Sequence, residues 1–438
     1  MMRTRSLFSF DFLLLSATVA LTIIGILFIY SSGVSAAGIV FSAEYIKQIV
    51  WVSLGLILLF IVSFSDYTRF KDWSLYIYIL FVLLLLITLF FGKRVNGAKS
   101  WLGFLNIGVG IQAGEFGKIG MILLLGSYLD ANRGSMRNLT TFMVGLGITM
   151  LPVALVMIEP DLGTALVYFP IFLVMTFVAG TKKRYVLFVL VTGTLLSVLS
   201  LLTFWQLNVT QAQASPLQIL TDRDFFKYLL YSIGAVLLVS LIGLYFMKRR
   251  YFYWLTYGFS SLFLGVMGTL AATSVLKPFQ VMRLIVFLNP NIDPRGAGWN
   301  IIQSITAVGS GGFFGKGFLH GTQSHYRFLP QQSTDFIFSI FSEEWGFVGV
   351  LLLFSLFLII FIRGLRIIAA SNDPFAVYIG SGIVAMFFFH MIVNVGMAIG
   401  IMPITGIPLL LVSYGGSSLW TALLGIGLLM NIHYRRYM

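Results

Sequence analysis

The 438-residue sequence contains no cysteine, few charged residues and only four histidines. Without cysteine the chain forms no disulfide and has no thiol chemistry, although this alone does not identify its compartment. Charged residues make up 10% of the chain and hydrophobic residues 58%, whereas soluble domains have about 25% charged and about 45–50% apolar residues. The composition therefore excludes an ordinary soluble globular protein.

Motifs for nucleotide and metal chemistry are also missing. The sequence has no P-loop, no dinucleotide-binding glycine pattern and no histidine cluster with metal-ligand spacing. His320 and His325 are five residues apart in a polar segment, where we expect them to be solvated. These absences disfavour ATP-driven transport and zinc chemistry, and we predict no metal site built by the protein.

Long apolar runs dominate the chain instead. A helix needs about 20 apolar residues to cross a bilayer core of about 30 Å. The runs lie at 12–31, 48–65, 74–91, 113–129, 141–158, 162–179, 185–205, 226–246, 252–276, 346–362, 376–400 and 408–432. A β-barrel is excluded because its strands would alternate polar and apolar residues. We therefore predict an all-α polytopic membrane protein with about 12 transmembrane helices, the first an uncleaved helix rather than a signal peptide.

The basic residues predict the orientation of these spans. Lys and Arg gather in short cytoplasmic loops of membrane proteins. The clusters assigned to that side are Arg3/Arg5, Arg69/Lys71, Arg133/Arg137, Lys182/Lys183/Arg184, Lys248/Arg249/Arg250, Arg363/Arg366 and Arg435/Arg436. Both termini are then cytoplasmic, and the net charge of +13 reflects membrane topology rather than nucleic-acid binding.

Residues 277–345 form a long polar segment between the ninth and tenth spans, and the same orientation places it outside. Segments of this length are rarely mere connectors. It contains several glycines and cations, among them Arg283 and Lys316, and Asp335 stands near its end where the apolar FIF begins. A partly desolvated carboxylate at such a boundary is a candidate proton acceptor; its alternative role is to cap the following helix.

Two further acidic positions are associated with the spans. Glu115 and Lys118 are three residues apart, so they share a helix face and can form a pair, with either a functional or a purely structural role. Asp161 lies in EPDLGT at a very short outer turn, where it is either a turn-forming residue or a site residue.

The first outer loop and the last span carry the remaining candidates. Lys99 lies close to Trp101, an arrangement that suits either a substrate diphosphate or the headgroups of anionic lipids. Near the C-terminus, prolines and the SYGGSS motif place Ser413, Gly415 and Gly416 at membrane depth. Helix breaks there either line a cavity or simply kink a packing helix.

These motifs together resemble the SEDS family of polytopic peptidoglycan polymerases. NPNIDPRGAGW, IQS, GSGG, GKG, GTQS, FLP, TDFIF and EEWG occur in that family's order, and the resemblance extends from the first span to SYGGSS. GTQS and IQS favour the elongation branch of the family over the division branch. Departures include Glu159 in place of Gln, and Gln331 and Ser333 in place of Glu and His.

The resemblance implies a glycosyltransferase that polymerises lipid II on the outer face of the bacterial cytoplasmic membrane, for cell elongation and shape. Asp335 matches the family's TDFIF motif and becomes the expected catalytic base. The candidate substrate-binding residues are Lys99, Trp101, Glu115, Lys118, Asp161, Arg283, Lys316, Gln323, Ser324, Ser413, Gly415 and Gly416.

The expected partners are lipid II, membrane lipid and a class B penicillin-binding protein with transpeptidase activity; nucleic acid is not expected. The sequence assigns no definite cofactor, and a divalent cation, Mg or Mn, at the diphosphate is left open. Residues 1–438 are expected to form one membrane domain in which 206–276 is a helix pair inserted into the family's ten-helix core. A flippase and a non-catalytic scaffold remain the alternative functions.

Overall fold

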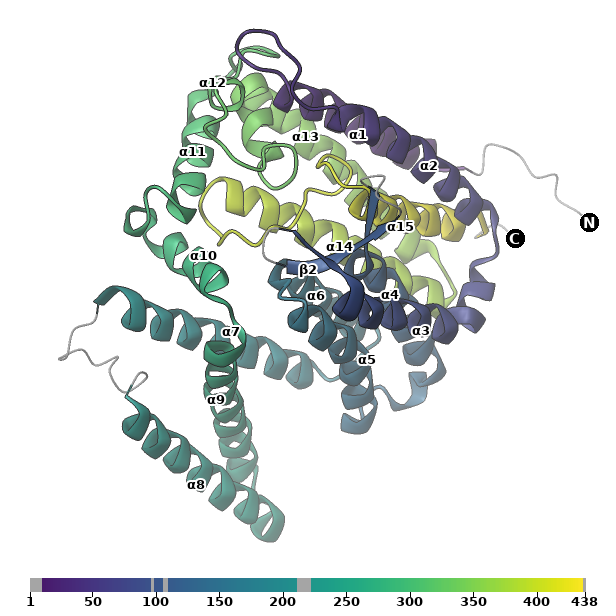
Figure 1. Cartoon of the computed structure of the whole chain (residues 1–438). Helices are drawn as coiled ribbons and strands as arrows, with labels where there is room; N and C mark the ends of the chain where they lie inside the picture. The colour runs from purple at the N-terminus through teal and green to yellow at the C-terminus, as the bar shows by residue number, and fades with distance from the viewer. Residues whose placement is uncertain (1–9, 96–97, 105–108, 211–221, 436–438) are drawn as a thin grey trace, which may run out of the picture. The chain divides into compact units, whose positions relative to one another are not determined.

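The computed structural model describes residues 10–95, 98–104, 109–210 and 222–435, and its elements are labelled in Figure 1. The long helices are α1 (Phe12–Ser32), α2 (Glu44–Phe64), α3 (Tyr67–Phe91), α4 (Ala113–Ala131), α5 (Leu139–Ile158), α6 (Leu162–Val178), α7 (Lys183–Trp205), α8 (Arg223–Met247), α9 (Arg250–Val275), α13 (Ile337–Ala370), α14 (Pro374–Ala398) and α15 (Gly416–Arg435). The shorter elements are α10 (Pro278–Leu288), α11 (Ala297–Ser310), α12 (Thr322–His325), η2 (Arg133–Ser135), η3 (Gln206–Thr210) and η5 (Pro290–Ile292).

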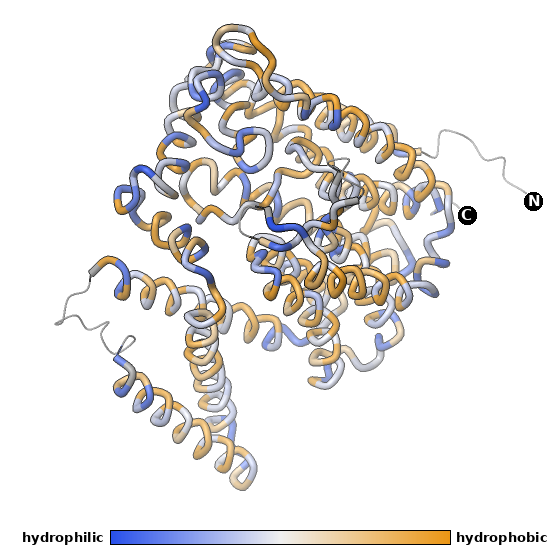
Figure 2. Tube along the Cα trace, viewed as in Figure 1, coloured by the Kyte–Doolittle hydropathy of each residue, from blue (hydrophilic) through white to orange (hydrophobic). Residues whose placement is uncertain are grey.

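The helices confirm the predicted polytopic membrane fold. Within the described residues, nine helices are long and apolar enough to cross a bilayer, and hydrophobic residues run along them in Figure 2. The other three predicted spans correspond to α4, α6 and α15. Helix α6 has only 17 residues, and α4 carries a buried ion pair. Each of the twelve predicted spans therefore overlaps a long helix.

Among the span starts that differ from the prediction, those of the last and third-last spans differ most. Helix α13 begins at Ile337, before the expected start, and is interrupted at Gly346, where φ is +59°. A Cβ on Gly346 would lie 2.2 Å from the Gly315 nitrogen, so the break lets the preceding loop approach the helix closely. The last span was expected to begin at Pro408, but α15 begins at Gly416 and the residues before it are not helical.

The segment 277–345 is not simply a loop, because it contains α10, α11, α12 and the start of α13. A small antiparallel sheet was also not predicted: β1 (Lys93–Val95), β2 (Ala98–Phe104) and β3 (Val109–Gln112) are ordered β1-β2-β3. This sheet leads directly into α4 and thereby fixes the start of that helix.

The described chain separates into two compact units. Residues 1–181 and 295–438 form the first, and 182–294 form the second. In the first unit α2 packs on α15, α3 on α4, α6 on α14 and α1 on α13. In the second unit α9 contacts both α7 and α8. The second unit includes α7 and α10 as well as the helix pair at 206–276, whose origin as an insertion stays a prediction.

Basic residues from the predicted cytoplasmic clusters form ion pairs in the first unit, most of them within the ends of helices. Asp130 accepts from both Lys71 and Arg133, and Arg435 pairs with Asp66 at 3.4 Å. Arg363 pairs with Asp11 at 2.8 Å, which connects α13 to the start of α1. Arg3, Arg5 and Arg436, which also belong to the predicted cytoplasmic clusters, lie outside the described residues.

Candidate functional site

Asp335 lies at the end of a short irregular segment that precedes α13, and its side chain is only 8% exposed. The N-cap position of α13 is occupied by Phe336, so the alternative assignment of Asp335 as the N-cap residue was wrong. Gln331 turns the chain with φ of +51°, and its carbonyl accepts the backbone N–H of Phe336 at 3.3 Å. The carboxylate is therefore presented by a tight turn rather than by a helix.

The backbone around Asp335 is fixed from outside the turn. In order, the carbonyl oxygens of residues 333–335 accept hydrogen bonds from the Tyr414 N–H at 2.8 Å, the Ser413 hydroxyl at 2.7 Å and the Asn394 side-chain amide at 2.9 Å. All three donors come from α14 or from the non-helical segment before α15. Asp335 and SYGGSS, which are distant in sequence, thus belong to one site.

Residues around Ser413 are held in turn by α2. Gln48 donates to the Ser413 carbonyl at 3.3 Å and accepts the Gly415 N–H at 3.3 Å. Gly415 has φ of +156°, a region that favours glycine. A Cβ on Gly416 would lie 3.0 Å from the Trp51 ring, so both glycines serve close packing. The predicted role of these residues in substrate binding is not tested by these contacts.

The predicted pairing of Glu115 and Lys118 is confirmed. Their side chains are 2.8 Å apart and fully buried in α4. Lys118 also contacts His390 Nε2 at 3.0 Å, and His390 Nδ1 contacts the Pro408 carbonyl at 2.9 Å. Because a carbonyl only accepts, Nδ1 carries the proton and Nε2 accepts from the Lys118 ammonium. The ion pair is thus connected to the segment that holds Asp335.

Asp161 is both a helix cap and part of a wider contact. It is the N-cap of α6, where it accepts the Thr164 N–H at 3.1 Å. It also accepts from the Gln112 side chain at 2.7 Å, while the Gln112 backbone N–H donates to Ser417 at 2.9 Å. Gln112 therefore connects two motifs that are far apart in the sequence, the EPDLGT turn and SYGGSS.

Glu159 precedes this turn and is almost completely buried, with 1% exposure. Its Oε1 has no hydrogen-bond partner among the described residues. Burial, assisted by the nearby negative charge of Asp161, raises the pKa of Glu159 to about 8. The sequence assigned no role to Glu159, but its environment favours a neutral carboxyl group at physiological pH.

Lys99 and Trp101 lie on β2. The Lys99 ammonium donates to the carbonyls of Leu89 and Phe90 at 2.7 and 2.8 Å, so it caps the C-terminal end of α3. Trp101 pairs across the sheet with Gln112. This places Trp101 beside the start of α4, while the predicted contact of either residue with a diphosphate stays untested.

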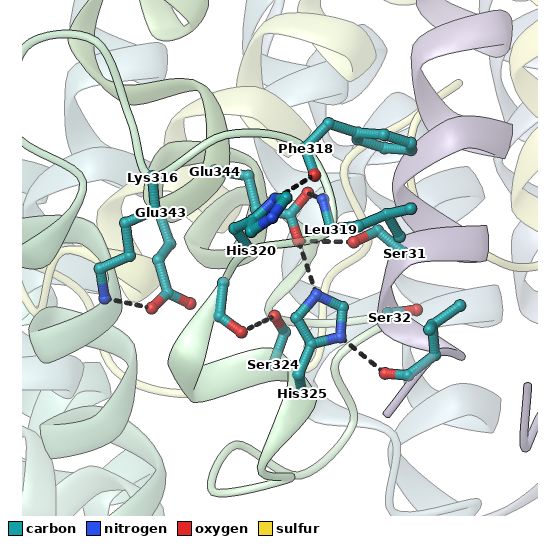
Figure 3. Close-up of polar contacts among 12 residues, drawn as sticks. Ser31, Ser32, Lys316, Phe318, Leu319, His320, Ser324, His325, Glu343 and Glu344 are labelled. Atoms are coloured by element: carbon teal, nitrogen blue, oxygen red, sulfur yellow. Dashed lines mark hydrogen bonds and ion pairs between the residues drawn. The ribbon is translucent and has the colours of Figure 1, made fainter. Parts of the chain in front are cut away.

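Glu343 organises the GTQS loop, as Figure 3 shows for its ion pair with Lys316. Its carboxylate accepts from Lys316 at 2.7 Å and from the backbone N–H groups of Thr322 and Gln323 at 2.8 and 3.1 Å. The Ser324 hydroxyl donates to a carbonyl within the same turn. Lys316, Gln323 and Ser324 are thereby brought together, as loop-forming residues in this structure.

The neighbouring Glu344 connects the same loop to α1. It accepts from the Ser31 hydroxyl and from the Leu319 N–H, and His325 Nε2 lies 3.6 Å away (Figure 3). His325 Nδ1 donates to the Val34 carbonyl at 2.7 Å. The expectation of a solvated His325 was wrong because its ring is buried against α1, whereas His320 is exposed.

Arg283 lies in α10, in the second unit, with its guanidinium 5.7 Å from the Phe279 ring. Among the described residues there is no group of three or more His, Cys, Asp or Glu side chains arranged to hold a metal ion.

The fold and site define a multi-pass membrane protein with a buried polar centre, and sequence comparison assigns its family. The FtsW, RodA and SpoVE family, described as "Cell cycle protein", matches residues 12–217 and 215–438. The chain belongs to this family, which is the SEDS family that its motifs resemble.

Individual relatives extend over almost the whole chain. "Peptidoglycan glycosyltransferase RodA" of Treponema pallidum is 51% identical over 435 residues, covering 99% of this chain and 100% of the relative. Stage V sporulation protein E of Bacillus subtilis is 31% identical, with 98% of each chain covered. "Peptidoglycan glycosyltransferase MrdB" of Escherichia coli K12 is 30% identical over 90% of this chain and 86% of the relative.

Solved structures agree in fold. A chain from "Structural coordination of polymerization and crosslinking by a peptidoglycan synthase complex" superposes with a TM-score of 0.64 at 26% identity, covering 98% of this chain and 99% of that chain. The Thermus thermophilus rod shape determining protein RodA has a TM-score of 0.60 at 24% identity, covering 98% of each chain.

Sequence reasoning missed three polar residues that assemble the site: Gln48, His390 and Asn394. His390 and Asn394 are four residues apart in the apolar run of α14. Polar side chains within a membrane span are costly unless they have partners, so this spacing was a usable signal for one polar helix face.

Proposed function

We propose that this chain is a peptidoglycan glycosyltransferase that polymerises lipid II on the outer face of the bacterial cytoplasmic membrane, for cell elongation and shape. The observation that carries the proposal is the buried Asp335 carboxylate, held on a turn whose three successive carbonyls are fixed by Tyr414, Ser413 and Asn394. Full-length similarity to a relative named as a peptidoglycan glycosyltransferase supports the substrate class.

In the proposed reaction Asp335 acts as the general base. It takes the proton from the 4-hydroxyl of one sugar as that oxygen attacks the anomeric carbon of the other substrate. The bond from the anomeric carbon to the diphosphate oxygen breaks, and the lipid diphosphate leaves with the bonding electron pair. General-base catalysis of this kind contributes about 10²–10⁴-fold, and the rigid turn keeps the carboxylate in place for it.

The remaining candidates of the first unit are proposed to bind lipid II around this carboxylate. Lys99 and Lys316 supply positive charge for phosphate oxygens, and Trp101 provides an interfacial ring. Arg283, in the second unit, is proposed as a further cation for the same substrate. The residues of the buried polar centre proposed to shape the substrate cavity are Glu115, Lys118, Asp161, Ser413, Gly415 and Gly416, with Gln323 and Ser324 on the outer loop. Mg²⁺ or Mn²⁺ at the diphosphate is an optional cofactor of this proposal, and chelation by EDTA during the assay tests it.

The orientation and partner are proposed on similar grounds. The paired basic ends of the helices, such as Lys71 with Asp130 and Arg435 with Asp66, are assigned to the cytoplasm together with both termini. A class B penicillin-binding protein is the proposed partner. This rests on the likeness to a chain whose structure is titled as a peptidoglycan synthase complex for polymerisation and crosslinking.

The decisive experiment incubates the purified chain with lipid II in detergent, with and without a class B penicillin-binding protein, and separates the glycan products by gel electrophoresis. Polymer formation by wild type that is absent from Asp335→Asn supports the proposal. In closed vesicles, movement of lipid II between leaflets without polymer formation would favour the flippase. If the chain neither polymerises nor moves lipid II, with or without the partner, the result would favour the non-catalytic scaffold.

A further inference from the structure

Helix α14 presents two buried polar residues to the segment that holds Asp335. His390 and Asn394 are 1% and 0% exposed and lie one helical turn apart. The Asn394 side-chain amide donates to the Asp335 carbonyl at 2.9 Å and to the Ile407 carbonyl at 2.8 Å. His390 donates to the next carbonyl along, that of Pro408, at 2.9 Å.

These contacts form one continuous path through the first unit. Glu115 pairs with Lys118, which donates to His390. His390 then holds the Pro408 carbonyl, and Asn394 joins the adjacent Ile407 carbonyl to Asp335. Every step is a hydrogen bond of 3.0 Å or less, apart from the single peptide link between residues 407 and 408, and all the groups are buried except the half-buried Pro408.

We propose that Asn394 and His390 are positioning residues that set the place of the Asp335 carboxylate and couple it to the Glu115–Lys118 pair. This inference rests on the proposed function, in which Asp335 is the base. Neither residue needs to touch substrate, because each acts through backbone carbonyls that determine where the carboxylate points.

The backbone is irregular on both sides of the Asn394 contact. Residues 333–336 precede α13, and residues 403–415 precede α15, so neither stretch has a helix to fix its carbonyls. A buried carbonyl without a donor is unfavourable, and the turn would shift to find one. Asn394 donates to one carbonyl from each stretch, so its loss would remove a hydrogen bond from both stretches at once.

Asn431 offers a matched control on α15. It is also 0% exposed, and its amide likewise donates to two backbone carbonyls, those of Val62 and Ser65. These carbonyls end α2, and Asn431 belongs to no contact of the Asp335 site. Asn394→Leu and Asn431→Leu therefore remove the same pair of side-chain donations at two different places, although the Ser65 carbonyl keeps Arg435 as a donor.

The first test measures Tm and lipid II polymerisation by wild type and both leucine variants. We expect both variants to lose Tm, but a drop in kcat of about 10–100-fold only for Asn394→Leu, with KM nearly unchanged, because small displacements of a catalytic group have effects of this size. Equal kcat losses in the two variants, or a change confined to KM, would overturn the positioning role.

The second test separates the two bonds of His390. In His390→Asn the shorter amide reproduces the Nδ1 donor toward Pro408, whereas in His390→Gln the longer one reproduces the Nε2 acceptor toward Lys118. Coupling through His390 requires both bonds, so each variant should reduce kcat by about 10-fold while keeping KM. Full activity of His390→Asn would exclude a role for the bond to Lys118, and full activity of His390→Gln would exclude a role for the bond to Pro408.

A readout independent of catalysis is hydrogen exchange of the peptide that contains residues 331–336. In this peptide the Phe336 N–H donates to the Gln331 carbonyl. Asn394→Leu should increase the rate of hydrogen exchange in the peptide, and Asn431→Leu should not. Unchanged exchange in Asn394→Leu would overturn the inference even if polymerisation falls. If wild type forms no polymer, the proposed function fails, while the exchange result still decides whether Asn394 holds the turn.

Discussion

The Ser413 hydroxyl donates to the Thr334 carbonyl at 2.7 Å and accepts the Leu409 N–H at 2.9 Å. One small side chain thus joins the turn before α13 to the segment before α15. Ser413→Ala should lower the free energy of unfolding by about 1–3 kcal/mol, because the buried Leu409 N–H and the half-buried Thr334 carbonyl each lose a partner. It should also reduce the rate of lipid II polymerisation relative to wild type.

The control for that variant is Ser381→Ala on α14. Its buried hydroxyl bonds only a carbonyl of its own helix, that of Tyr378. We expect Ser381→Ala to keep its activity. Equal thermal unfolding and equal activity in the two variants would mean that Ser413 does not connect the two segments.

Asp335→Asn removes the proposed base while keeping the size of the side chain. We expect polymerisation to fall at least about 100-fold, with Tm close to that of wild type. Asp224→Asn is the control, since Asp224 is exposed on α8 and its ion pair within the described part of the chain is with Lys227. Near-normal polymer formation by Asp335→Asn would end its assignment as the base.

Glu115 and Lys118 should tolerate joint neutralisation better than the loss of one charge. Glu115→Gln leaves the buried Lys118 ammonium without its counter-charge, at a cost of about 3–5 kcal/mol. Glu115→Gln/Lys118→Met removes both charges and should recover much of that loss in thermal unfolding. If the double variant unfolds at or below the temperature of the single variant, the pair does not act as a unit.

Glu159 should make the stability depend on pH in a defined direction. Its folded pKa of about 8 lies above the usual value of 4.5, so between these values the folded state binds the proton that the unfolded state has lost. Stability therefore falls as pH rises through this window, by a total on the order of a few kcal/mol.

Glu159→Gln stays neutral and removes this dependence. Its Tm should exceed that of wild type by more at pH 9 than at pH 6. The measurement is thermal unfolding in one detergent across this range. Parallel curves for the two proteins would contradict the assignment of a neutral Glu159 in the folded state.

The sequence by itself determined the membrane fold and the positions of the spans, because a helix that crosses lipid must be long and apolar along its whole length. It also determined the Glu115–Lys118 pair, since spacing along one helix is a local property. Motif order sufficed to identify the family and to select Asp335. These are all features that depend on residues close together in the chain.

Only the tertiary structure decided which motifs meet. That Asn394 and Ser413 hold the Asp335 turn, and that His390 joins Lys118 to Pro408, depends on the packing of helices far apart in sequence. The early start of α13 and the buried His325 follow from the same cause, because their polar groups find partners on other elements. Hydropathy measures only transfer from water to lipid, so it cannot say which buried polar groups satisfy one another.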